Sequence, residues 1–338
     1  MIRKTETLAM TVLLIAVYCS LGLGQALPPT IIEIDVENLV QYHEDMSDFS
    51  KFATNPSITT PAVPRNFGYF LIIGDIVAVN GQPAKGTFVN TTRTAGLRPA
   101  PNPGQAIADV LRNTVNNQIF EILKSDGTAI GTITTFGLGG AGPAPPGAPL
   151  QVTQGNNAII GGTGAFFGAR GESGQTTTPQ NIPQRQASMA EDPANRRING
   201  GGKARFVEHV IPTSVPQIVA TSGGPAVTHS SDFALVSASK PAAAGEILSI
   251  FATGLGPVRA AINPGQPFPS NPPAAVNSPV EVTVNGRPAE VLAAVGYPGT
   301  LDSYQVNFRV PTDTAKGPAS VQVSAAWIAG PAVNIMIQ

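Results

Sequence analysis

Cysteine is almost absent from this chain of 338 residues, which has Cys19 alone. Cys19 lies in an N-terminal segment that we expect to be removed, so the mature chain has no thiol. That absence excludes disulfide cross-links and thiolate catalysis from the mature protein. An exported protein of this size without cysteine is typical of bacterial secretion.

Charge is also scarce. Charged residues make up 12% of the chain and the formal net charge is −1, whereas a charged fraction of about 25% is usual. A nearly neutral chain offers no electrostatic attraction for nucleic acid or an anionic membrane surface. We therefore expect neither as a partner.

Residues 1–26 have the features of a secretory signal peptide. A basic start over 1–4 precedes a mostly apolar stretch over 8–21 and small residues over 22–26. The apolar stretch is too short for a membrane span. Tyr18 precedes Cys19 where a lipoprotein anchor needs a small residue. The pattern predicts cleavage near Gly24 or Ala26, a mature chain without a membrane span, and a secreted or cell-envelope location.

Familiar catalytic and metal-binding motifs are missing as well. The chain lacks Gly-x-Ser-x-Gly, His-Glu-x-x-His and a phosphate loop ending in Gly-Lys-Ser/Thr. The stretch His-Glu-Asp-Met-Ser-Asp over 43–48 gathers metal-capable groups without a recognised ligand spacing. We interpret it as a solvated acidic loop and expect neither a metal nor a cofactor.

The chain does contain strands and tight turns. An apolar strand over 67–79 runs into Asn80-Gly81, a dipeptide typical of two-residue hairpin turns. A second hairpin over 116–136 turns at Asp126-Gly127, and 204–211 predicts the closing strand of a barrel. Residues 175–202 are rich in Thr, Pro, Gln and Gly and predict a long loop.

Asp75 and a group of four charged residues in the long loop each have two interpretations. Asp75 is the one charged residue of an apolar strand. It is either a pocket acid whose burial raises its pKa or, as we favour, a residue at the barrel rim or facing outward. Four charged residues of the long loop either clamp a polar ligand or, as we favour, pair with one another in solvent; they are Glu191, Asp192, Arg196 and Arg197.

The most informative stretch is the glycine-rich segment 157–172. Its Gly-Gly-Thr-Gly follows an apolar run, as a dinucleotide-binding loop would, but the third glycine falls at 168 where that motif needs 167. The residues that follow also lack a helical pattern. We therefore interpret 157–172 as two barrel strands joined by a tight turn. Alternation places Phe166, Gly168, Arg170 and Glu172 on one face of the second strand.

The segments Gly-Thr-Gly-Ala-Phe over 162–166 and Ala-Arg-Gly over 169–171, with the upstream hairpin 117–136, resemble plant dirigent proteins and the related allene oxide cyclase barrel. The resemblance covers 32–211 and is strong over 117–172. It implies an eight-stranded antiparallel barrel with an apolar pocket at one mouth, needing no cofactor. It also implies that Arg170 faces the pocket; a salt bridge of Arg170 with Glu172 is the alternative. Asp75, Phe166 and Glu172 are the further candidate ligand-binding residues. The loop after the motif is longer here than in plant members.

The pattern changes after residue 211. Short strands alternate cleanly over 280–285, 304–310 and 333–338 with Gly/Pro turns between them, which predicts an antiparallel β-sandwich. Residues 241–257, 284–289 and 304–311 resemble an immunoglobulin-like (IPT/TIG-related) domain found in secreted proteins of soil bacteria. The predicted organisation is a signal peptide (1–26), a barrel domain (27–211) and an immunoglobulin-like domain (212–338).

Without a catalytic constellation, the favoured function is a secreted binding or structural module. Its barrel is expected to hold a small apolar or phenolic ligand. Its C-terminal part is expected to attach to an extracellular protein or polysaccharide. The alternative is a cofactor-free stereo-directing protein or cyclase/isomerase of the dirigent type, so the sequence alone leaves open whether the protein is an enzyme.

Overall fold

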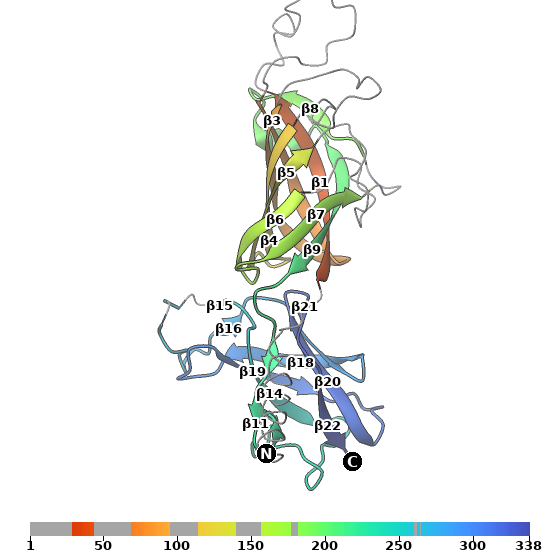
Figure 1. The fold of residues 1–338 in the computed structure, drawn as a ribbon, viewed down its shortest axis with the longest axis vertical. Coiled ribbons are helices and arrows are strands. Elements are labelled where there is room, and N and C mark those ends of the chain that lie inside the picture. The colour runs from red at the N-terminus through yellow and green to blue at the C-terminus, as the bar shows by residue number, and fades with distance from the viewer. Residues whose placement is uncertain are drawn as a thin grey trace, which may run out of the picture.

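The computed structural model describes residues 29–43, 69–94, 114–139, 157–176, 182–259, 262–263 and 265–338. Two groups of strands follow one another along the chain (Figure 1), as the all-β prediction requires. Among the described residues, no helix is long and apolar enough to cross a membrane. The predicted signal peptide and residues 44–48 of the acidic cluster lie outside the described ranges.

The first group of strands closes into an eight-stranded antiparallel barrel, which confirms the prediction for this part of the chain. Closure arises because β1 hydrogen-bonds to both β2 and β9, so β9 is the closing strand that the sequence predicts. The strands are β1 (Thr30–His43), β2 (Tyr69–Val79), β3 (Gln82–Thr94), β4 (Thr114–Lys124), β5 (Ala129–Gly139), β6 (Asn157–Gly164), β7 (Arg170–Thr176) and β9 (Gly202–Ile211).

The predicted hairpin turns are present. Asn80 and Gly81 join β2 to β3 with φ angles of 48° and 73°, values that Asn and Gly adopt more readily than other residues. Gly127, between β4 and β5, has φ 89°, and the neighbouring Asp126 carboxylate accepts a hydrogen bond from the backbone N–H of Thr128 at 2.8 Å. These turns fix the register of the two hairpins.

The barrel interior changes from apolar to polar along its axis. In the middle, Phe88, Phe120 and Phe206 pack together with ring centroids 4.7–5.1 Å apart. One cross-strand row carries mostly polar side chains; it starts near the end of β3 and runs across β4, β5, β6 and β7 to β9. The row is Thr92, Asn116, Gly137, Asn157, Ser173 and Glu208. An eight-stranded barrel is just wide enough to be filled by large side chains, so small polar ones at one end leave space.

The second group contains eleven strands in one connected antiparallel sheet, with β11 and β12 as a separate pair. Its long strand β18 pairs with β17 through Arg287–Ala289 and with β19 from Glu290 onward, across an irregularity between Val291 and Ala293. Pairing on both sides of this irregularity joins the eleven strands into one connected sheet. The strands are β10 (Gln217–Ile218), β11 (Ala220–Thr221), β12 (Gly224–Pro225), β13 (Val227–His229), β14 (Ile247–Thr253), β15 (Val258–Arg259), β16 (Ala275–Val276), β17 (Val280–Val284), β18 (Arg287–Gly296), β19 (Ser303–Arg309), β20 (Gly317–Ala325), β21 (Ile328–Ala329) and β22 (Val333–Ile337).

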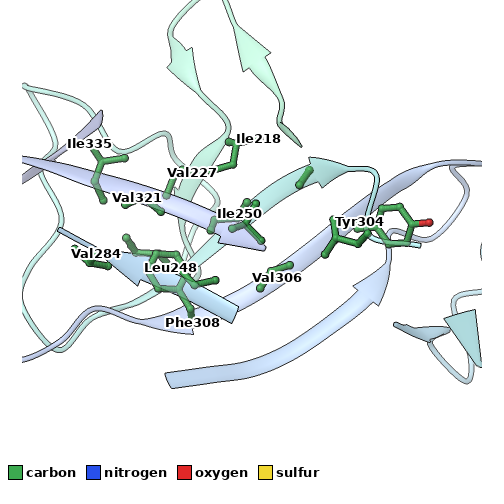
Figure 2. Packing of buried hydrophobic residues seen from close by; sticks show 14 of the residues in the cluster. Ile218, Val227, Leu248, Ile250, Val284, Tyr304, Val306, Phe308, Val321 and Ile335 are labelled. Carbon is green, nitrogen blue, oxygen red and sulfur yellow. The ribbon is translucent and has the colours of Figure 1, made fainter. Parts of the chain in front are cut away.

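The predicted alternation in this sheet is confirmed by burial. Tyr304, Val306 and Phe308 of β19 point into one hydrophobic core, while the residues between them are only partly buried. Leu248 and Ile250 of β14 lie opposite Phe308 and Val306 in the strand register, and Figure 2 shows these four side chains packed together.

The tip of the β20–β21 hairpin packs against the hydrophobic core of the barrel. Ala326 and Ile328 are buried in the same cluster as the interior of the barrel, and Trp327, the single tryptophan, packs against it. Ala326 and Trp327 have φ angles of 49° and 64°, a conformation that costs non-glycine residues energy and persists because packing fixes it. The C-terminal sheet thus contacts the barrel at the end where β1 begins and β9 finishes, where β21 lies in Figure 1.

The segment predicted as a long loop, 175–202, is more ordered than expected. It includes the last residues of β7, the short strand β8 (Arg185–Ser188) and a 3-10 helix, η3 (Pro193–Arg197). Strand β8 pairs in parallel with the end of β1, and Ala187 is buried with Val40 and Tyr42 in a small cluster outside the main barrel core. Asn38, at φ 54°, marks the irregularity in β1 beyond which these outward residues occur. Propensity alone could not predict this segment, because tertiary packing against the barrel wall stabilises it.

Candidate functional site

A cavity of about 430 Å³ lies inside the polar end of the barrel. Leu39, Ile72, Phe88 and Phe206 form its apolar lining. Its polar lining consists mainly of carboxamide and hydroxyl groups, from Asn90, Asn116, Gln118, Asn157 and Ser173. The strand register gives this arrangement, because these residues occupy inward-facing positions of β3, β4, β6 and β7. The cavity can therefore hold an apolar group and hydrogen-bond to polar atoms on it.

Some polar groups of this end are hydrogen-bonded to each other and others are not. The Thr92 hydroxyl donates to Asn116 Oδ1 at 3.2 Å, and the Thr135 hydroxyl donates to Gln118 Oε1 at 2.9 Å. In contrast, no described residue donates a hydrogen bond to the buried oxygens Asn90 Oδ1 and Asn157 Oδ1. Buried polar atoms without a partner are costly and uncommon. The carboxamides that carry these two oxygens both line the cavity.

Glu208 is the one carboxylate of the polar row. It is fully buried, and its Oε1 lies 2.8 Å from the hydroxyl oxygen of Ser173, while Oε2 has no partner among the described residues. Burial raises the pKa of Glu208 to about 8, against the opposing effect of the hydrogen bond from Ser173. At neutral pH the side chain is thus an uncharged carboxylic acid. Ser173 lines the cavity and Glu208 lies behind it.

One wall of the cavity comes from the segment before and within β8. Ile182, Pro183, Gln184 and Gln186 all line the cavity, and the Gln184 carboxamide donates to the side-chain oxygen of Gln41 on β1. A segment that lines a cavity must be held in place if the cavity is to keep its shape.

Asp75 helps to hold that segment. Its carboxylate accepts two hydrogen bonds of 2.8 Å from Arg197, one from buried Arg196 and one of 2.9 Å from Asn38. Burial alone would raise the pKa of Asp75, but the hydrogen bonds from Arg197, Asn38 and Arg196 outweigh it and hold the pKa at about 2. Asp75 is therefore an ionised anchor for η3 on the outer barrel wall, and a proton-transfer role with a raised pKa does not fit it.

The charged residues of the long loop form different pairs from those we favoured. Arg196 and Arg197 bind Asp75 on β2 rather than the neighbouring acids. Glu191 instead accepts two hydrogen bonds from Arg185, at 2.6 and 3.0 Å. The Asp192 side chain accepts from the backbone N–H of Ala194 at the start of η3. The loop charges thus fix the segment to itself and to the barrel.

Arg170 and Glu172 lie on the outer face of the barrel. In the register of β7 with β9, Arg170 pairs with exposed Ile211. Gly171, which lies between Arg170 and Glu172, pairs with fully buried Val210. The Arg170 guanidinium donates to the backbone oxygens of Ile160 at 2.7 Å and of Ala169 at 2.9 Å. Its observed contacts therefore tie the β6–β7 turn together, and Arg170 is not among the residues that line the cavity.

Phe166 lies at the other end of the barrel. Residues 165–169 form the turn between β6 and β7, so Phe166 is not on a strand with Arg170 as expected. Its side chain is buried in the barrel core and borders a smaller cleft of about 220 Å³ beside the C-terminal sheet. The structure thus brings none of Arg170, Asp75, Phe166 and Glu172 into the lining of the polar cavity among the described residues.

The sequence carries a signal for buried Glu208 but none for the carboxamides that line the cavity. The signal lies in alternation: on β9, Ala204, Phe206 and Val210 are inward-facing apolar residues, and Glu208 stands in phase with them. A charged residue in the apolar phase of a strand predicts a buried carboxyl. The carboxamides of the cavity give no such signal, because Asn and Gln are ordinary on either face of a strand end.

The described residues contain no group of three or more His, Cys, Asp or Glu side chains that could hold a metal ion. No family model matches the chain. No curated protein matches it either. Among solved structures, a polysaccharide lyase is similar with a TM-score of 0.18 and 8% identity, over 91% of this chain and 40% of that structure. At that score the likeness carries no argument about fold or function.

Proposed function

We propose that this protein is a secreted, non-catalytic binding module whose barrel holds a small, mostly apolar ligand with hydroxyl groups, such as a phenol. The observation that carries the proposal is a half-apolar cavity lined by two carboxamides, Asn90 and Asn157, whose buried oxygens have no partner among the described residues. A ligand that donates hydrogen bonds to these oxygens relieves the cost of burying them.

The size and lining of the cavity support a small amphipathic ligand. Its volume of about 430 Å³ is within the range of small-molecule sites. Phe88 and Phe206 offer ring faces against which a planar apolar group can pack. The cavity contains no unpaired charge from the described residues that would favour an ionic ligand, because Lys203 at its edge pairs with Glu37 at 2.6 Å.

Calorimetric titration of the full mature chain with 4-ethylphenol and 4-ethylanisole tests this proposal. 4-Ethylanisole has a methyl group in place of the hydroxyl proton of 4-ethylphenol, so only the phenol can donate a hydrogen bond to the unpartnered oxygens. A hydrogen bond to a buried, otherwise unsatisfied group corresponds to roughly tenfold tighter binding. We expect that preference for the phenol in the native chain.

Variants locate the binding. Asn90→Leu removes one unpartnered oxygen inside the cavity, and it should abolish most of the preference for the phenol. Asn117→Leu is the matched control, because Asn117 is exposed on the outer face of β4. Equal affinity for both molecules, or an equal effect of both variants, would contradict the proposal.

The organisation of the chain supports a carrier or attachment role. We assign the barrel domain to 27–211 and an immunoglobulin-like domain to 212–338, with 1–26 removed on export. The sheet after residue 217 has its own hydrophobic core, which fits a domain that docks on an extracellular protein or polysaccharide. Mass spectrometry of the protein from culture medium tests the export step, and a chain that begins near residue 25 or 27 is expected.

The stereo-directing or cyclase alternative has less support. It relied on an arginine in the pocket, and the contacts of Arg170 are with backbone oxygens of the β6–β7 turn. Binding without chemistry therefore remains the function that the cavity favours.

A further inference from the structure

The buried pair of Ser173 and Glu208 specifies the ligand further than its hydroxyl groups do. We propose that Ser173 presents a hydrogen-bond donor to the cavity because Glu208 behind it is uncharged, and that the ligand therefore carries an oxygen acceptor, such as a ketone or aldehyde carbonyl. This inference rests on the proposed binding function and names a second chemical feature of the same ligand.

The first step of the argument is geometric. Ser173 lines the cavity, and its hydroxyl oxygen lies 2.8 Å from Glu208 Oε1. Glu208 is fully buried and is not among the cavity-lining residues, so it acts on a ligand only through Ser173. A serine hydroxyl has one proton and two lone pairs, and a carboxylic acid has one proton.

The second step compares where the acid proton can sit. If it is on Oε1, Glu208 donates to Ser173 Oγ, and the Ser173 proton is free to point into the cavity. If it is on Oε2, that O–H has no acceptor among the described residues, because Oε2 has no partner there. A buried donor without an acceptor is costly. The first arrangement is therefore favoured once the cavity holds an oxygen acceptor near Ser173.

The third step is what happens when Glu208 loses its proton. A carboxylate only accepts hydrogen bonds, so Ser173 must donate its single proton to Glu208 and can only accept from the cavity. The cavity then changes from a donor to an acceptor at this one position. A ligand carbonyl bound at Ser173 loses its hydrogen bond.

Among the residues that the structure describes, no other charged side chain compensates for this change. On β7 the neighbouring charged residues, Arg170 and Glu172, lie on the outer face. On β1 the charged residues beside Ile32, the partner of Glu208, are Glu33 and Asp35, and both bind Arg205 of β9 on the outer face. His209 and Lys203, the remaining titratable residues of β9, alternate with the inward residues of that strand, and Lys203 pairs with Glu37. Burial of Glu208 accounts for its raised pKa, against the opposing effect of the contact with Ser173.

Two matched ligands test the inference: 4-acetylbenzyl alcohol, which has a ketone, and 4-ethylbenzyl alcohol, which has none. Neither ionises over the range used, so pH acts on the protein alone. At about pH 6, where Glu208 is neutral, we expect the ketone to bind the full mature chain roughly fivefold more tightly. At about pH 9.5, where Glu208 is ionised, that preference should vanish or reverse.

Variants separate this explanation from others. Glu208→Gln has an amide that donates to Ser173 at every pH, so its preference for the ketone should persist at about pH 9.5. Ser173→Ala removes the donor and should remove the preference at both pH values. Glu172→Gln on the outer face of β7 is the control and should behave as the native chain does.

The outcomes distinguish the two proposals. If both ligands bind equally at about pH 6 and binding still depends on Asn90, the binding function stands and the role of Ser173 and Glu208 is refuted. A ketone preference that does not change with pH, or that survives in Ser173→Ala, also refutes the role of Ser173 and Glu208. If neither ligand binds, both proposals fall.

Discussion

The uncharged state of Glu208 makes a quantitative prediction about folding. In the folded chain burial raises the pKa of this carboxyl from 4.5 to about 8. The unfolded chain exposes it to water, where the ordinary pKa applies. Between these two pH values the folded state keeps a proton that the unfolded state has released. Its contribution to stability is therefore fully present below pH 4.5 and is lost as pH rises through about 8.

The magnitude follows from the size of the shift. Each pKa unit corresponds to about 1.4 kcal/mol, so a rise from 4.5 to about 8 corresponds to roughly 5 kcal/mol. Replacement of Glu208 by Gln removes the titration and keeps the shape. The free energy of unfolding of the native chain, minus that of Glu208→Gln, should fall by about 1.4 kcal/mol per pH unit from about pH 5 to 8 and level off above.

Urea unfolding followed by tryptophan fluorescence measures this difference. Trp327 is the single tryptophan and packs against the barrel core, so its emission reports loss of barrel packing. Glu172→Gln makes the same chemical change on the outer face of the barrel and should alter stability by less than about 0.5 kcal/mol. Parallel pH profiles for the native chain and Glu208→Gln would show that Glu208 is ionised when folded and would refute the reasoning.

Three further substitutions, one with a matched control, test the barrel and its contact with the C-terminal sheet. Asp75→Asn leaves buried Arg196 without its counter-charge, so we expect the free energy of unfolding to fall by about 2–3 kcal/mol and proteolysis within 182–201 to become faster. In the native chain the stability that ionised Asp75 contributes is present above pH 3.8 and should disappear as pH falls through about 2. Phe120→Ala should cost about 3–5 kcal/mol in denaturant unfolding, whereas Phe136→Ala, on a half-exposed outer position of β5, should cost less than about 1 kcal/mol. Trp327→Ala should cost about 1–3 kcal/mol and separate the thermal unfolding of the barrel from that of the C-terminal sheet, which calorimetry detects.

Local sequence signals predicted much of the strand architecture. Asn80-Gly81 and Asp126-Gly127 require left-handed backbone, and both turns occur where they were expected. The alternation over 304–310 matches the buried and half-buried positions of β19. Such signals are reliable because they depend on steric limits and on a period of two, which act within a few residues.

Contacts between distant segments could not be predicted in the same way. Asp75 and Arg196 are 121 positions apart, and their pairing depends on how 182–201 packs against the outer wall. The sequence around each residue looks like a solvated charge. The position of β8 beside β1 is equally hidden, because it follows from the irregularity at Asn38 that turns Val40 and Tyr42 outward.

The placement of Arg170 shows how alternation and resemblance can disagree. Alternation correctly groups Arg170 with Glu172 on one face of β7, but it does not say which face is inward. The opposite face carries Gly171, Ser173 and Gln175 with neither charge nor bulk, so both faces are short of apolar residues. The resemblance assigned the inward face to Arg170, whereas the register with buried Val210 assigns it to Gly171 and Ser173.

The polar row is hard to explain by stability alone. Large apolar side chains would fill the end of an eight-stranded barrel as Phe88, Phe120 and Phe206 fill its middle. Instead the row combines a glycine, small hydroxyls and carboxamides with an acid that weakens folding at neutral pH. Residues that oppose stability while shaping a cavity are expected where a ligand supplies the missing contacts. Ligand binding should therefore raise the thermal stability of the native chain more than that of Asn90→Leu, because the variant lacks one of the two unpartnered oxygens.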